Sequence, residues 1–209
     1  MSKSAVVTYG RFQGITIGHE ALVKKMIKFN KDADVILFTS TTVDNKKNIL
    51  SFNEKVWFLK KIFPNIIIVN DRNVNATIIT SLHYLYKEGY NDVTVFVGED
   101  RFTKFKALEK YNIPESDSKF DSEKNFSFDS LKFKLAGKRL LDSGSNVEKA
   151  SSTELKKLAQ LDDFNSFKKM MPLSTSKQVA TKLFNILRKR LPMKENKNMI
   201  MSFLEFIKG

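Results

Sequence analysis

The chain has 209 residues, 42% of them hydrophobic, which suffices for one domain with a single core and a smaller appendage. It has no cysteine and only two histidines, which excludes disulfides and thiol chemistry and argues against a histidine-rich metal site. The net charge of +13 indicates a polyanionic ligand or partner, and the lack of a long apolar run or leader-like N-terminus predicts a cytoplasmic protein without a membrane span.

Short β-rich runs alternate with amphipathic helical stretches through the first half of the chain. A capping box formed by Ser51 and Glu54 begins one helix, and Pro64 ends it. The continuous apolar run at residues 66–69 is typical of a strand whose two faces are both covered. We predict strands at residues 5–9, 34–39, 65–69 and 93–97, with helices at 18–29, 51–63 and 75–88 between them. This order predicts an α/β protein with a Rossmann-like, doubly wound parallel sheet.

The second half continues the pattern and ends in a basic tail. We predict a helix at 101–111, a mobile polar insertion at 114–129, a fifth strand at 130–136, and helices at 153–160, 176–190 and 194–207. The last 37 residues carry eight Lys or Arg and two Glu. We therefore divide the chain into a domain at 1–172 and a basic helical C-terminal extension at 173–209. This charge indicates either a solvated helix face or a surface for nucleic acid or a protein partner.

The loop after the first strand has the composition of a phosphate-binding loop. In open parallel sheets, ligands bind outside the carboxyl ends of the strands. Gly10, Gly14 and Gly18 let the backbone approach a ligand, and the following helix offers free N–H groups and the positive end of its dipole. Thr16 and His19 add hydrogen-bond donors. The spacing matches neither the dinucleotide fingerprint nor the P-loop.

Residues 16–19 (TIGH) resemble the H-x-G-H or T-x-G-H signature of the nucleotidyltransferase superfamily. This superfamily includes adenylyltransferases acting on nicotinamide mononucleotide or phosphopantetheine, and cytidylyltransferases. The run at residues 10–13 (GRFQ) is similar to the opening of nicotinamide mononucleotide adenylyltransferases. Thr16, in place of the first histidine, is similar to the phosphopantetheine branch.

Three later stretches resemble the superfamily in the same order. Residues 47–51 (KNILS), followed by Glu54 and Lys55, are similar to its Asn-Pro-x-Thr/Ser and Glu-Arg element. Residues 98–101 (GEDR) resemble its Gly-x-Asp segment, and residues 150–156 (ASSTELK) resemble its I-S-S-T-x-x-R signature. The likeness covers residues 6–172 and is strongest to nucleotidyltransferase-like proteins of large tailed phages, which would place the protein in the host cytoplasm.

The resemblance implies transfer of a nucleoside monophosphate, first of all AMP from ATP, to a small phosphorylated acceptor such as nicotinamide mononucleotide, with release of pyrophosphate. His19, supported by Thr16, would contact the α- and β-phosphates, and Lys156 would hold the leaving pyrophosphate. Mg²⁺ would be held mainly through the triphosphate, without protein ligands. The acceptor would contact Lys47 and Asn48. The other expected nucleotide-binding residues are Gly10, Arg11, Phe12, Gly18, Gly98, Asp100, Arg101, Ser151, Ser152 and Thr153, with Lys24 as a weaker candidate for a phosphate contact.

Three positions depart from the superfamily pattern. Gly14 stands where proline is usual, Thr16 where many adenylyltransferases have histidine, and Lys156 where arginine is expected. Lysine cannot make the planar two-point phosphate contact of arginine. The sequence therefore leaves open a slow or inactive nucleotidyltransferase-fold protein with a structural or nucleic-acid-binding role. It also leaves open the choice between ATP and CTP, the acceptor, and the oligomeric state.

Overall fold

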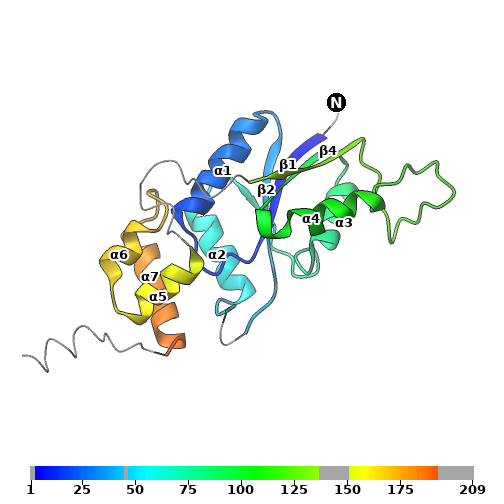
Figure 1. Ribbon diagram of the computed structural model, residues 1–209. Coiled ribbons are helices and arrows are strands. Elements are labelled where there is room, and N and C mark those ends of the chain that lie inside the picture. Colours follow the sequence, from blue (N-terminus) through cyan, green and yellow to red (C-terminus); the bar gives the residue numbers. More distant parts are fainter. Residues whose placement is uncertain (1–2, 45–46, 137–150, 193–209) are drawn as a thin grey trace, which may run out of the picture.

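A computed structural model describes residues 3–44, 47–136 and 151–192. Five parallel strands form one sheet in the order β3-β2-β1-β4-β5 (Figure 1). The strands are β1 (Lys3–Gly10), β2 (Asp34–Thr39), β3 (Ile67–Ile68), β4 (Tyr90–Val97) and β5 (Ser130–Leu135). The predicted α/β fold with a five-stranded parallel sheet is confirmed. The third strand is shorter than predicted and lies at the sheet edge, where only one neighbour can pair with it.

The helices follow the predicted order with two differences. They are α1 (Ile17–Phe29), α2 (Phe52–Ile62), α3 (Ile78–Lys87), α4 (Phe102–Lys106), α5 (Ser152–Gln160), α6 (Phe164–Lys169) and α7 (Lys177–Arg190). The helix predicted at 101–111 is a short α-helix between two 3-10 turns, and α6 was not predicted. The predicted helix at 194–207 lies outside the described residues. No helix among the described residues is long and apolar enough to cross a membrane.

Both faces of the sheet are buried, each by its own hydrophobic core. Leu37 packs on the face covered by α1 and α2, and the next residue, Phe38, packs on the opposite face with α3. Both side chains are fully buried. Successive residues of a strand point to opposite faces, so a strand covered on both sides must be apolar at every position. This explains why the strands form continuous hydrophobic runs in the sequence.

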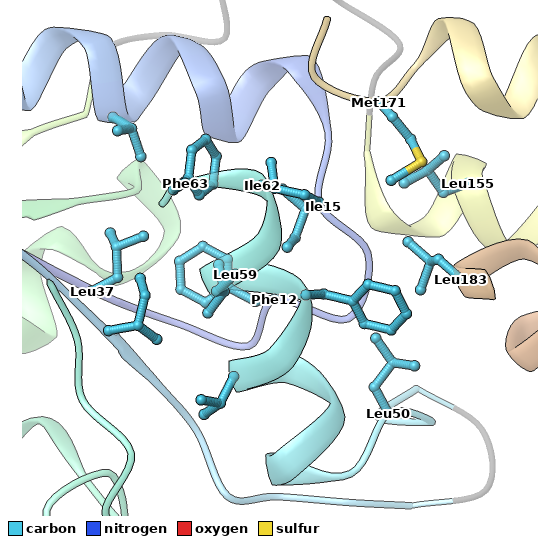
Figure 2. Close-up of a cluster of buried hydrophobic side chains, with 14 of the residues drawn as sticks. Phe12, Ile15, Leu37, Leu50, Leu59, Ile62, Phe63, Leu155, Met171 and Leu183 are labelled. Atoms are coloured by element: carbon cyan, nitrogen blue, oxygen red, sulfur yellow. The ribbon is translucent and has the colours of Figure 1, made fainter. Parts of the chain in front are cut away.

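Helix α7 is part of the first of these cores. Its Ala180, Leu183 and Leu187 are fully buried in the cluster that also contains Leu155 of α5. Figure 2 shows Leu183 and Leu155 close to Phe12 of the first loop. The apolar residues recur at helical spacing, while the basic residues that give the tail its charge occupy the opposite side of the helix. Within the described residues, α7 is therefore not an extension that begins after Pro172.

The polar insertion at 114–129 is anchored at its C-terminal end. Phe126 and Phe128 are buried in the core beside α3. The side chain of Asn112 accepts a hydrogen bond from the Phe128 N–H at 2.8 Å and donates one to the Phe128 carbonyl at 3.1 Å. The expectation of a mobile surface segment is therefore wrong for this end, because two aromatic side chains and an asparagine fix it to the domain.

Candidate active site

The predicted site residues lie around the carboxyl ends of β1 and β4. Strand β1 is central: β2 and β3 are added on one side of it, and β4 and β5 on the other, so the order in which strands are added reverses between β1 and β4. Such a switch point leaves a crevice between the loops that follow the two strands, and this is where open α/β sheets bind ligands. Residues 11–16 follow β1, and Gly98 to Arg101 follow β4.

The backbone of the first loop is shaped by packing beneath it. Phe12 has a φ of 42°, and its side chain is only 4% exposed, in the core near Leu50 and Leu183 (Figure 2). A Cβ at Gly10 would lie 2.8 Å from the Phe12 ring, so glycine is needed there to accommodate this ring. Phe12 is one of the expected nucleotide-binding residues. Its ring is directed into the core, so any contact of this residue with a nucleotide would come from its backbone.

Gly14 explains one departure from the superfamily pattern. Its φ is 156°, and a Cβ would lie 3.2 Å from the side chain of Leu155. Proline fixes φ near −65° and cannot adopt this conformation. The usual proline would therefore require a different loop backbone from the one that packs here against α5.

Thr16 and His19 form the start of α1. The Thr16 N–H donates a hydrogen bond to Nδ1 of His19 at 3.1 Å, and the Thr16 hydroxyl lies 3.0 Å from the same nitrogen. Burial lowers the pKa of His19 to about 4, so the ring is neutral at pH 7. Because Nδ1 accepts the backbone hydrogen bond, the single ring proton belongs on Nε2. Thr16 itself is 1% exposed, and both its N–H and its hydroxyl contact His19.

The N-terminus of α5 packs directly against the first loop. The Ser152 hydroxyl donates a hydrogen bond to the Gly14 carbonyl at 2.8 Å across a separation of 138 residues. The start of α1 is also bonded to the segment after α6, because the Ile17 N–H donates to the Met170 carbonyl at 3.0 Å. The two motifs that were expected to bind phosphate are therefore neighbours in space.

The hydroxyls of the second motif have different roles. Ser151 is the N-cap of α5, and its side chain accepts a hydrogen bond from the Glu154 N–H at 3.1 Å. Ser152 holds the first loop, whereas Thr153 is exposed. The first turn of a helix leaves backbone N–H groups without partners inside the helix, and these favour an anion.

Cations from different segments converge beside this helix start. Lys156 of α5 donates a hydrogen bond from Nζ to the Lys47 carbonyl at 3.0 Å. Burial lowers the pKa of Lys156, Arg11 and Lys47 lower it further through their positive charges, and Asp44 opposes them. Arg11 and Lys47 therefore lie close enough to Lys156 for their positive charges to disfavour its own. A polyphosphate would relieve this repulsion. Lys24, by contrast, pairs with Glu20 of its own helix at 2.8 Å.

The segment after β4 lines the other side of the switch point. Gly98 is exposed, and Arg101 lies 3.8 Å from the carboxylate of Asp100. Burial raises the pKa of Tyr9, and the charge of Arg101 opposes this shift. Arg101 is thus near the end of β1 as well as the end of β4. Gly98, Asp100 and Arg101 thus follow β4 directly, at the switch point.

Asn48 lies in a tightly bonded loop between β2 and α2. Its side-chain amide donates to Asp44 at 2.5 Å, and Asp44 also accepts the backbone N–H groups of Lys47 at 2.5 Å and Asn48 at 3.1 Å. Asn48 is 7% exposed, and its Oδ1 has no partner among the described residues. A buried acceptor without a partner costs free energy, and a ligand or water that donates a hydrogen bond would recover it.

Sequence reasoning missed two residues that hold this loop. Gln13 accepts the Leu50 N–H at 2.7 Å, and Lys55 donates from Nζ to the Thr42 carbonyl at 3.2 Å and to the Ser40 carbonyl. Lys55 is fully buried, and burial, with a smaller effect of Arg72, lowers its pKa to about 8. The sequence does contain an indication of this buried lysine, because Lys55 interrupts the otherwise apolar face of α2.

No cluster of three His, Cys, Asp or Glu side chains suited to a metal ion occurs in the described ranges.

Comparisons with known proteins give a matching family and several similar solved structures. Residues 7–177 match the model of the family described as cytidylyltransferase-like. A Plasmodium falciparum nicotinic acid mononucleotide adenylyltransferase complexed with NaAD is similar in structure, with a TM-score of 0.58 and 18% identity over 88% of this chain and 98% of that chain. A bifunctional NMN adenylyltransferase/ADP ribose pyrophosphatase from Francisella tularensis gives a TM-score of 0.52 and 15% identity, over 100% of this chain and 57% of that one. No curated protein matches the sequence.

Proposed function

Because the chain belongs to the cytidylyltransferase-like family, we propose that it transfers a nucleoside monophosphate from a nucleoside triphosphate to a small phosphorylated acceptor. The observation that carries this proposal is the hydrogen bond from the Ser152 hydroxyl to the Gly14 carbonyl. It joins the loop before α1 to the start of α5, so that two helix N-termini and the cations Arg11 and Lys156 border one site.

Our first choice of substrates is ATP and nicotinamide mononucleotide. The similar solved structures are described as adenylyltransferases acting on nicotinic acid mononucleotide or NMN, which supports this choice. On the acceptor side, Lys47 supplies positive charge that suits a phosphorylated acceptor, and Asn48 Oδ1 is available to accept a hydrogen bond. The comparisons do not favour the alternative of a purely structural or nucleic-acid-binding role.

The reaction needs alignment and charge neutralisation more than covalent chemistry from the protein. An acceptor phosphate oxygen attacks the α-phosphorus, the bond from this phosphorus to the bridging oxygen breaks, and the electron pair leaves with pyrophosphate. His19 donates a hydrogen bond from Nε2 to a phosphate oxygen while its Nδ1 stays bonded to Thr16. Lys156 carries three N–H donors on Nζ, so it can keep its bond to the Lys47 carbonyl and also pair with the leaving pyrophosphate. Mg²⁺, when bound with the triphosphate, neutralises part of the phosphate charge.

The proposal is tested by measuring pyrophosphate release with Mg²⁺, ATP or CTP, and a panel of acceptors. The panel consists of nicotinamide mononucleotide, nicotinic acid mononucleotide, phosphopantetheine and glycerol 3-phosphate. We expect acceptor-dependent release that His19→Ala abolishes and His83→Ala leaves intact, because His83 packs on Phe126 away from the first loop. Absence of release with every pair, from a folded protein, would refute the proposal.

A further inference from the structure

Arg190, the last residue of α7, reaches a loop that is far away in the sequence. Its guanidinium contacts both carboxylate oxygens of Glu54, at 2.7 and 2.8 Å, and Nη1 also donates to the Ile49 carbonyl at 3.1 Å. Planar two-point pairing of this kind is specific to arginine. Residue 190 lies beyond the segment 7–177 that matches the family model.

The carboxylate that Arg190 holds also organises the start of α2. Glu54 Oε2 accepts the Ser51 N–H at 2.8 Å and the Ser51 hydroxyl at 2.9 Å, which forms the capping box of this helix. Burial alone would raise the pKa of Glu54, but Arg190 and Ser51 hold it below its usual value. Glu54 therefore remains a carboxylate that connects Arg190 to Ser51 at neutral pH.

These contacts fix the backbone on both sides of Asn48. The Lys47 carbonyl is held by Lys156 of α5, and the Ile49 carbonyl is held by Arg190 of α7. Asn48 lies between them with its Oδ1 unpartnered among the described residues. The helices α5 and α7 thus act together as a clamp on this stretch of the loop.

We propose that Arg190 is a positioning residue for the acceptor substrate: through Ile49 and Glu54 it holds Asn48 in the orientation that binds the phosphorylated acceptor. The inference rests on the proposed function for the identity of the acceptor. It assigns Arg190 no contact with the reacting atoms. Loss of Arg190 should therefore weaken acceptor binding while leaving the triphosphate side, which is built on Gly14 and Ser152, unchanged.

If Arg190 only stabilised the fold, its substitution would have a different effect from the one proposed. Exposed ion pairs contribute little to global stability, and the side chains of Arg190 and Glu54 are 43% and 24% exposed. Arg188, on the same helix, supplies a matched control. It pairs with Asp162 at 2.9 Å, and the two side chains are 44% and 47% exposed. Asp162 lies between α5 and α6, so this pair does not reach the loop around Asn48. If the ion pair mattered only for stability, the two arginines should behave alike.

The experiment compares Arg190→Gln, Arg190→Lys and Arg188→Gln with the wild-type chain. Pyrophosphate release is measured with ATP and nicotinamide mononucleotide, each varied in turn. In Arg190→Gln we expect the KM for nicotinamide mononucleotide to rise about tenfold, as for loss of a charged hydrogen bond, with the KM for ATP little changed. Arg190→Lys should restore part of this loss, and Arg188→Gln should leave both constants unchanged. An unchanged acceptor KM in Arg190→Gln, or an equal rise in both constants, would overturn the proposal.

Amide hydrogen exchange separates this inference from the proposed function. The Ser51 N–H is held by Glu54, so its exchange should accelerate in Arg190→Gln and not in Arg188→Gln. If the wild-type chain releases no pyrophosphate with any acceptor, the proposed function fails, and accelerated exchange at Ser51 would still support the positioning of the loop by Arg190. Equal exchange in both variants would refute that positioning.

Discussion

The backbone N–H of Thr16 lies 3.1 Å from Nδ1 of His19 and donates a hydrogen bond to it. A backbone N–H can only donate, so Nδ1 must be the unprotonated nitrogen of a neutral ring. The local structure at the start of α1 thereby determines which nitrogen carries the proton that we assign to the phosphate contact. The backbone N–H of Thr16, and not only its hydroxyl, therefore makes Nε2 the nitrogen of His19 that donates a hydrogen bond.

Nitrogen NMR can test this assignment directly. We expect His19 to be the neutral Nε2–H tautomer at pH 7 and to titrate at about pH 4, because burial disfavours its charged form. The only other histidine is His83, so a His83→Gln variant leaves a single imidazole to observe. A proton on Nδ1, or titration near the ordinary histidine value, would contradict the proposed arrangement.

Substitutions at Thr16 and His19 should differ in their effect on turnover. His19→Ala removes the phosphate donor, and kcat should fall by about 100-fold or more, as for loss of a donor to developing charge. Thr16→Val removes the hydroxyl but keeps the backbone N–H, so kcat should fall by less than about tenfold. Steady-state kinetics at saturating substrates would show this ranking, and an equal loss in both variants would count against it.

Lys55 should make stability depend on pH in the alkaline range. Its pKa is about 8 in the folded protein and about 10.5 in an unfolded chain, so between these values the unfolded state binds more protons. Stability due to Lys55 therefore rises with pH through this window, by at most about 3 kcal/mol.

This effect is measured by urea unfolding of the wild-type chain and Lys55→Met from about pH 7 to about pH 10. The difference in unfolding free energy should shift in favour of the wild-type chain as pH rises. Lys60→Met, at an exposed position of the same helix, is the control and should show no such trend. Parallel curves for Lys55→Met and the wild-type chain would refute the expectation.

Helix α7 should be required for folding. Leu183 is fully buried in the core beside α5, so Leu183→Ala should lower the free energy of unfolding by about 2–5 kcal/mol. Lys189→Ala, on the exposed side of α7, should change it by less than about 0.5 kcal/mol. A chain that ends after Pro172 should lose cooperative unfolding. Retention of a sharp transition by that shortened chain would show that α7 is dispensable.

Much of the fold can be predicted because it depends on local patterns. The alternation of apolar runs and amphipathic helices follows from the periodicity of strands and helices, and it led to the parallel sheet. The capping box at Ser51 and Glu54 was visible in the same way. Placement of the TIGH run and Gly98 at the ends of β1 and β4 followed, because the carboxyl ends of parallel strands share one edge of the sheet.

Other features depended on contacts between residues more than a hundred positions apart. Lys156 bonds the Lys47 carbonyl, Arg190 bonds the Ile49 carbonyl, and Ser152 bonds the Gly14 carbonyl. Backbone carbonyls occur at every residue, so no side-chain pattern indicates which of them a distant cation will reach. The direction of the Phe12 ring was undetermined for a similar reason, because an aromatic residue in a loop can serve either a ligand or a core.

The sequence by itself thus determined the order of the elements and the edge of the sheet where the site lies, because strand and helix periodicity and the two-sided burial of a parallel sheet are recorded residue by residue. Only the tertiary structure decided that α7 belongs to the core and that α5 and α7 clamp the loop around Asn48. Those relationships arise when separate elements pack together, and the free energy that selects them belongs to the assembled core rather than to any one segment.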